Sequence, residues 1–127
     1  MNAQKTILVV EDEPDQIAYL ETLLKDQGFA VITAGDGREG FEKAKSSHPD
    51  LITLDISMPG RSGADVFARL RSDEALARIP VVIVTGAIDF RELMYKRNVP
   101  PPDGYVAKPI DPELLLMTLR KVLEVSH

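Results

Sequence analysis

The residues best suited to chemistry in this sequence are carboxylates that directly follow apolar segments. Asp55 comes after Leu51–Leu54, and Glu11 and Asp12 come after Thr6–Val10. Both segments run through apolar and β-branched residues without regular polar alternation, which indicates strands buried on both faces. The carboxyl ends of parallel strands meet at one edge of a sheet, where open α/β folds bind their ligands. We therefore expect the three carboxylates to converge at that edge.

A hydroxyl and an ammonium group stand at the ends of two later apolar segments. Thr85 ends one of them, followed by Gly86, and Lys108 follows the other. Carboxylates that lie close together repel one another unless a cation is present, and Mg²⁺ prefers oxygen ligands that it shares with phosphate. The set could therefore hold a phosphoryl group on Asp55, with the metal on one side and Lys108 and Thr85 on the other.

The chain alternates between strand and helix patterns, which predicts a parallel sheet with helices on both faces. Pro14 suits the first turn of a helix and Gly28 its end, while Asp36 with Glu39, and Asp111 alone, have the positions of helix caps. The predicted strands cover about 6–10, 30–34, 51–55, 81–85 and 104–107, and the predicted helices about 14–27, 37–46, 63–71, 88–98 and 112–125.

Composition narrows the class of protein. A chain of 127 residues, 44% of them hydrophobic, favours one domain with a substantial core. The absence of cysteine excludes disulfides and thiolate metal sites, and a formal charge of −5 argues against direct nucleic-acid binding. There is no apolar run long enough for a membrane span and no secretory signal pattern, so we expect a cytoplasmic protein. No DNA-binding helix pair follows the last predicted helix, so 1–127 is expected to be a single domain without an output domain.

Four short motifs occur in a characteristic order along almost the whole chain. They are Glu11-Asp12, Asp55-x-x-Met58-Pro59-Gly60-x-x-Gly63, Thr85-Gly86-Ala87 and Lys108-Pro109. Each motif is weak alone, but together they resemble the receiver domain of two-component response regulators, in the chemotaxis-receiver-like superfamily. The resemblance implies a flavodoxin-like (βα)5 fold, a doubly wound parallel five-stranded sheet of strand order 2-1-3-4-5.

The resemblance also implies a role for each site residue. Asp55 should accept a phosphoryl group from a sensor histidine kinase or a histidine phosphotransfer protein. The expected Mg²⁺ ligands are the carboxylates of Asp12 and Asp55, Glu11 through water, and the backbone carbonyl of Ser57. Lys108 should pair with the phosphoryl oxygens, and its bond to Pro109 should be cis. Beyond catalysing its own phosphorylation and dephosphorylation, such a domain is not expected to be an enzyme.

The same resemblance implies a switch. Thr85 should move to hydrogen-bond the phosphoryl group, and Tyr105 matches the aromatic residue that turns inward as this happens, although it would also suit an ordinary amphipathic strand. The readout should be the face of the fourth helix, fifth strand and fifth helix. Leu114, Met117 and Val125 fall outside the core stripe of the last helix, as a candidate partner or homodimer patch or as scattered exposed apolar residues.

One segment departs from the family pattern, and three other readings remain open. Pro100-Pro101-Pro102 stands where receivers usually carry a Gly-Ala pair, which puts the usual output face in doubt. A phosphatase of the haloacid dehalogenase type would need an acid at Ser57, and an FMN-binding flavodoxin would not tolerate three acidic residues after its first strand. A pseudo-receiver would bind partners without phosphorylation. The sequence names neither the kinase, the target nor the oligomeric state.

Overall fold

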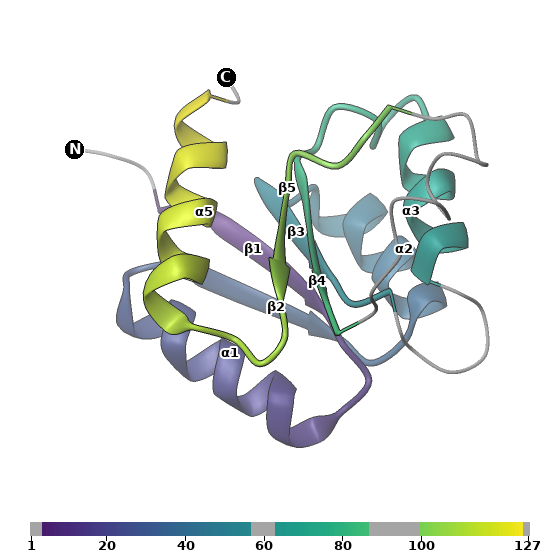
Figure 1. The fold of residues 1–127 in the computed structure, drawn as a ribbon. Helices are drawn as coiled ribbons and strands as arrows, with labels where there is room; N and C mark the ends of the chain where they lie inside the picture. The colour runs from purple at the N-terminus through teal and green to yellow at the C-terminus, as the bar shows by residue number, and fades with distance from the viewer. Residues whose placement is uncertain (1–3, 57–62, 87–99, 126–127) are drawn as a thin grey trace.

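Five parallel strands form one sheet in the order β2-β1-β3-β4-β5 (Figure 1). The computed structural model describes residues 4–56, 63–86 and 100–125 of the chain. This order confirms the predicted α/β fold class. The strands are β1 (Thr6–Val10), β2 (Ala30–Ala34), β3 (Leu51–Leu54), β4 (Val81–Thr85) and β5 (Gly104–Ala107).

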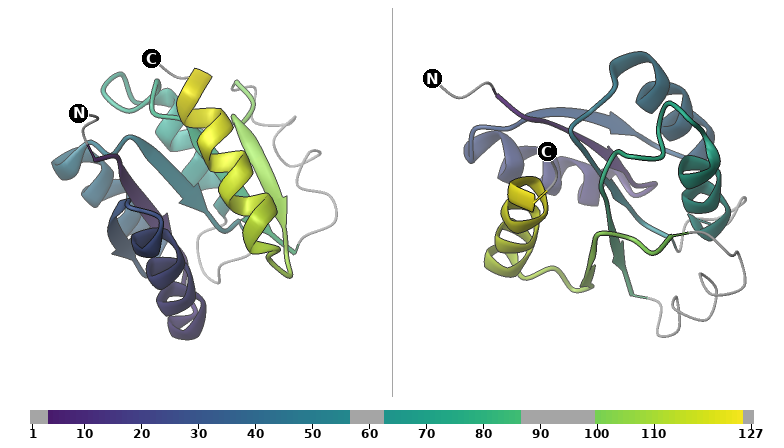
Figure 2. Two further views of the ribbon diagram at one scale, coloured as in Figure 1. Left: turned by 90° about the vertical axis from the view of Figure 1, so that its left-hand side faces the viewer. Right: turned by 90° about the horizontal axis from the view of Figure 1, so that it is seen from above.

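Helices cover both faces of the sheet, as the alternating pattern predicts (Figures 1 and 2). Helices α1 and α5 pack on one face and α2 and α3 on the other. The helix expected over 88–98 lies outside the described residues. The described helices are α1 (Pro14–Asp26), α2 (Gly37–Ser47), α3 (Gly63–Ser72) and α5 (Pro112–Val125).

The core consists of two apolar layers, one on each side of the sheet, because successive side chains of a strand point to opposite faces. In β1, Ile7 and Val9 pack with α1 and α5, whereas Leu8 and Val10 pack with α2 and α3. The three central strands β1, β3 and β4 are buried almost throughout. These buried strands position the residues that follow their carboxyl ends.

The helix ends follow from local chemistry. Asp36 accepts a hydrogen bond from the Glu39 backbone N–H (2.8 Å), and Glu39 in turn accepts one from the Gly35 N–H (2.6 Å). Asp111 accepts from the Glu113 N–H in the first turn of α5 (3.0 Å). Gly28 has a φ of 93°, a conformation that suits the residue after a helix. Where predicted and observed element ends differ, they differ by one residue; the strand expected over 51–55 ends at Leu54.

The glycines of α2 have a packing reason. A Cβ atom on Gly40 would lie 2.8 Å from Val10 Cγ2, so only glycine lets the helix approach β1 this closely. The weak helix propensity of this segment is therefore the cost of close packing beneath the end of β1. Among the helices that the structure describes, none has the length and apolarity needed to cross a membrane.

Candidate functional site

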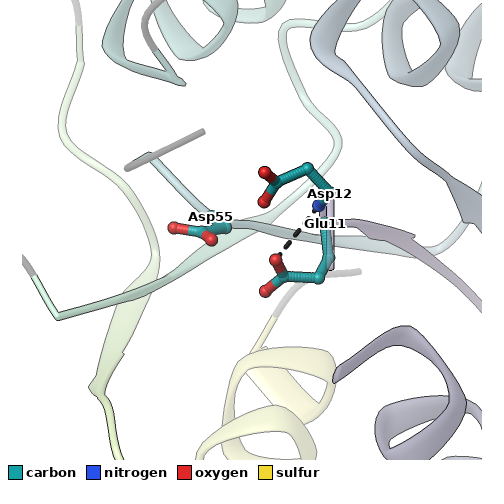
Figure 3. Close-up of side chains that lie close together, drawn as sticks. All are labelled: Glu11, Asp12 and Asp55. Carbon is teal, nitrogen blue, oxygen red and sulfur yellow. Dashed lines mark hydrogen bonds between the residues drawn. The ribbon is translucent and has the colours of Figure 1, made fainter. Parts of the chain in front are cut away.

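The three predicted carboxylates meet at the carboxyl edge of the sheet (Figure 3). Strands β1 and β3 are neighbours, with Val10 beside Leu54, so the residues that follow each strand emerge side by side. The Asp55 backbone N–H donates to the Val10 carbonyl at 3.1 Å, which extends the ladder by one step. Carboxylate oxygens of Glu11, Asp12 and Asp55 all lie within 4.8 Å of one another.

Two of these carboxylates are almost completely buried. Glu11 is 1% exposed and Asp55 is 3% exposed, whereas Asp12 is partly open to solvent. Burial raises the pKa of Glu11 above its usual 4.5; the hydrogen bond from Lys108 lowers it in part, and the charge of Asp55 raises it again. Burying several like charges is unfavourable, so the site needs positive charge to be stable.

Lys108 supplies that charge from the end of β5. Its ammonium nitrogen donates to Asp55 Oδ2 at 2.9 Å and to Glu11 Oε1 at 3.0 Å. Burial alone would lower the pKa of Lys108, but its hydrogen bonds to the two carboxylates outweigh that effect and raise its pKa above the usual 10.5. Lys108 is therefore a fixed cation at neutral pH.

Glu11 also stabilises the backbone of the loop after β1, a role that the sequence did not indicate. Its Oε2 accepts hydrogen bonds from the backbone N–H groups of Asp12 (3.0 Å) and Glu13 (3.2 Å), the first of which is drawn in Figure 3. One oxygen of Glu11 thus shapes the loop after β1 and the other holds Lys108. Asp12 is the more accessible carboxylate of the cluster.

The structure also describes Thr85 and Tyr105, two further predicted site residues. Thr85 is buried at the end of β4, and its carbonyl accepts the Lys108 backbone N–H at 2.9 Å. The peptide bond between Lys108 and Pro109 is cis, as predicted. Tyr105 is exposed on β5. Ser57 lies outside the described residues.

The donor set fits a hard divalent cation. Every candidate ligand in the cluster is a carboxylate oxygen, the ligand type that Mg²⁺ prefers. Three carboxylates against one ammonium leave a formal charge of −2 when all are ionised. A divalent ion beside Asp12 would balance that charge without displacing Lys108.

A separate apolar surface lies between α5 and β5. Leu114, Met117 and Val125 are exposed, as the helical spacing predicts, and together with Tyr105 they line a groove of about 490 Å³. Lys121 and Asp103 add charge at its rim. This groove is distinct from the acidic cluster.

Comparisons with known proteins agree with this geometry. A family model described as the response regulator receiver domain matches residues 7–120. The chain is 34% identical over 117 residues to protein PilH of Pseudomonas aeruginosa, an alignment that covers 92% of this chain and 96% of PilH. It is 40% identical over 123 residues to hybrid signal transduction histidine kinase D of Dictyostelium discoideum, which covers 91% of this chain and only 8% of that protein.

A solved structure extends the likeness to three dimensions. The receiver domain of sensor histidine kinase PA1611 from Pseudomonas aeruginosa superimposes with a TM-score of 0.85 at 26% sequence identity. The superposition covers 96% of this chain and 99% of that one. That structure is described as having a magnesium ion coordinated in its active-site cleft.

Proposed function

Because the chain belongs to the family of response regulator receiver domains, we propose that it is a phosphorylation-dependent switch whose phosphoryl acceptor is Asp55. As a receiver domain it is a signalling module of two-component systems and not a conventional enzyme. The observation that supports Asp55 most directly is its pairing with Lys108 at 2.9 Å, next to Glu11 and Asp12.

Phosphoryl transfer needs positioning and positive charge more than covalent help from the protein. In the proposed reaction an Asp55 oxygen forms a bond to phosphorus while the bond between phosphorus and the donor's histidine nitrogen breaks, with the electron pair staying on that nitrogen. Lys108 lies where it would stabilise the negative charge of the transferring group. Thr85, at the end of the neighbouring strand, would donate its hydroxyl to a phosphoryl oxygen.

Asp12 and Asp55 would hold Mg²⁺ directly, Glu11 would do so through water, and the Ser57 carbonyl would complete the protein ligands. When bound, the ion neutralises charge on the phosphoryl oxygens. The all-oxygen cluster supports this assignment, as does the magnesium ion of the PA1611 receiver domain. Glu11 already uses both of its oxygens, which favours the indirect role for it.

The switch would consist of a change of partner for Lys108. A phosphoryl group on Asp55 adds negative charge and acceptor oxygens, so it would compete with Glu11 for the Lys108 ammonium. Such a change would favour a conformation in which Thr85 is drawn toward the phosphoryl group and Tyr105 turns inward. The exposed groove beside Tyr105 and α5 is the surface that would report the change to a protein target or a second copy of the chain.

Receiver domains interact with histidine kinases, and the donor proposed here is a sensor histidine kinase or a histidine phosphotransfer protein. Acetyl phosphate can replace either protein in a test, because it needs no cognate partner. Incubation with acetyl phosphate and Mg²⁺ should give a single phosphoryl adduct, stable in acid and labile in base, detected by intact-protein mass spectrometry.

Two aspartates at opposite ends of β3 give a matched pair of variants. Asp55→Asn should abolish the adduct, whereas Asp50→Asn should retain it, since Asp50 lies before β3, where its side chain accepts the Thr6 backbone N–H at 2.7 Å. An adduct that persists in Asp55→Asn would refute the assignment of the acceptor. No adduct in the unmodified protein would favour a pseudo-receiver that binds partners without phosphorylation.

A further inference from the structure

Strand β5 has little side-chain burial to fix its position. It is four residues long, lies at the edge of the sheet, and only Val106, which is 1% exposed, is buried in the core. A one-residue shift of such a strand would exchange its faces, moving Val106 outward and Tyr105 inward. The pairing register of β5 must therefore depend on the hydrogen bonds and ion pairs at the two ends of the strand.

The amino end of β5 is fastened to the beginning of β4 by Asp103. The Asp103 backbone N–H donates to the Val81 carbonyl at 2.9 Å, and Asp103 Oδ1 accepts the Val81 backbone N–H, also at 2.9 Å. The same oxygen accepts a hydrogen bond from Arg71 Nη2 at 2.6 Å. One carboxylate oxygen thus joins two strands and a helix.

Arg71 is buried behind this carboxylate, with its side chain only 6% exposed. Nη1 donates to the Ile79 carbonyl and Nη2 to the Pro101 carbonyl, each at 3.0 Å. The guanidinium lies 5.0 Å from the centre of the Phe67 ring. A buried arginine with this many partners connects α3, the entry to β4 and the triple-proline segment, because its planar donors reach several acceptors at once.

We propose that Arg71 and Asp103 form the register anchor of β5, holding Val106 inward and Tyr105 outward. The anchor compensates for the low burial of the strand, and through the Pro101 carbonyl it also holds the proline segment before β5. The opposite end of β5 is held by Lys108, whose partners would change under the proposed function. The amino-terminal anchor involves none of those groups and needs no phosphoryl transfer.

Thiol accessibility can test the anchor, because the chain contains no cysteine. V106C reports opening of β5, and V9C, at a fully buried position of β1, reports opening of the whole sheet. Each is combined with R71M and, separately, with D103A, and the rate of modification by a maleimide is measured without phosphoryl donor or Mg²⁺. The ratio of the V106C rate to the V9C rate should rise about tenfold in both combinations, since β5 is released while the central strands stay closed.

R69M is the matched control, because Arg69 lies in the same turn of α3 but is exposed and stacks on Phe41 at 4.2 Å. It should leave the ratio unchanged. A ratio that stays constant in R71M or D103A, with both rates rising together, would mean general destabilisation and would overturn the anchor. Should R71M fail to fold, D103A decides alone, because the Asp103 side chain is 36% exposed and its loss creates no closed cavity.

Discussion

The two ends of β5 both carry a cation that pairs with carboxylate, but their charge balance differs. At the carboxyl end, Lys108 contacts Asp55 and Glu11, and Asp12 lies beside them, so acidic charge is in excess. At the amino end, Arg71 pairs with one carboxylate, Asp103, and its other hydrogen-bond acceptors are neutral carbonyls. The first cluster carries a formal excess of negative charge, while the second is neutral as it stands.

We expect this difference in charge to separate a responsive end of β5 from a static one. A cluster with excess charge changes its free energy when a metal ion or a phosphoryl group arrives, because each alters the balance of charge around Lys108. In a neutral cluster whose carboxylate and carbonyls are already hydrogen-bonded, a metal ion or a phosphoryl group would not lower the free energy further. We therefore expect chemistry at the carboxyl end of β5 and stability at the amino end.

Lys108→Met should have the largest effect, on the rate of phosphorylation. Removing a positioned donor of this kind typically slows the reaction by about 10²–10³-fold, equivalent to about 3–4 kcal/mol. The measurement is the rate of adduct formation from acetyl phosphate at saturating Mg²⁺. Lys25→Met is the control, since Lys25 forms an exposed pair with Glu21 on α1 and should leave the rate unchanged. A rate in Lys108→Met close to that of the unmodified protein would remove the distinction between the two ends.

Arg71→Met should instead act on the free energy of unfolding, lowering it by about 3 kcal/mol, because it removes the charged donor from Asp103 and leaves the Ile79 and Pro101 carbonyls without their hydrogen bonds from Arg71. Arg69→Met removes an exposed contact with Phe41 and should cost less than about 1 kcal/mol. Urea denaturation followed by circular dichroism compares the two. If the two variants lose the same free energy of unfolding, the burial of Arg71 contributes little to stability.

Mg²⁺ should stabilise the protein through the carboxyl end alone. An ion present at a hundred times its dissociation constant adds about 2.7 kcal/mol to the free energy of unfolding. Arg71→Met should keep this increment although its baseline is lower, and Asp12→Asn should lose most of it. Thermal denaturation with Mg²⁺ and with EDTA measures the increment. Stabilisation of Asp12→Asn to the same extent would place the ion elsewhere.

The smallest effect concerns pH. The pKa of Glu11 is raised from 4.5, so in the folded state the proton is held more tightly, and this favours folding at low pH. That contribution is lost as pH rises through the raised pKa, where the excess negative charge develops. Mg²⁺ competes with the proton, so its affinity should rise with pH above 4.5, by at most about tenfold per unit, and then level off. Titrations of Mg²⁺ at a series of pH values test this, and an affinity independent of pH would contradict it.

Much of the fold follows from local rules that act over a few residues. Apolar runs predict the buried strands, and Pro14, Gly28, Asp36 and Asp111 mark helix ends through backbone geometry and hydrogen bonds to nearby N–H groups. The residues of the site were also predictable by type, because in a parallel sheet the carboxyl end of every strand faces the same edge. These signals do not require knowledge of distant contacts.

Other features depend on which distant groups meet. His48 is exposed, yet its ring nitrogen Nε2 lies 3.0 Å from the Ala75 carbonyl, 27 residues further along the chain. Arg69 and Arg71 occupy the same turn of α3, and helical spacing places Arg71 one turn beyond Phe67 but does not identify its distant acceptors. Only packing against the entry to β4 and the proline segment turns one into a surface contact and the other into a buried cation.

The sequence by itself determined the order of strands and helices, the caps, and the chemical types at the carboxyl edge, because each of these follows from neighbours along the chain. The tertiary structure alone decided that Glu11 divides its oxygens between Lys108 and its own loop, and that Arg71 holds the far end of β5. The physical reason is that burial and long-range hydrogen bonds depend on which surfaces come together. Residues 71 and 103, or 11 and 108, are neighbours only after the sheet has formed.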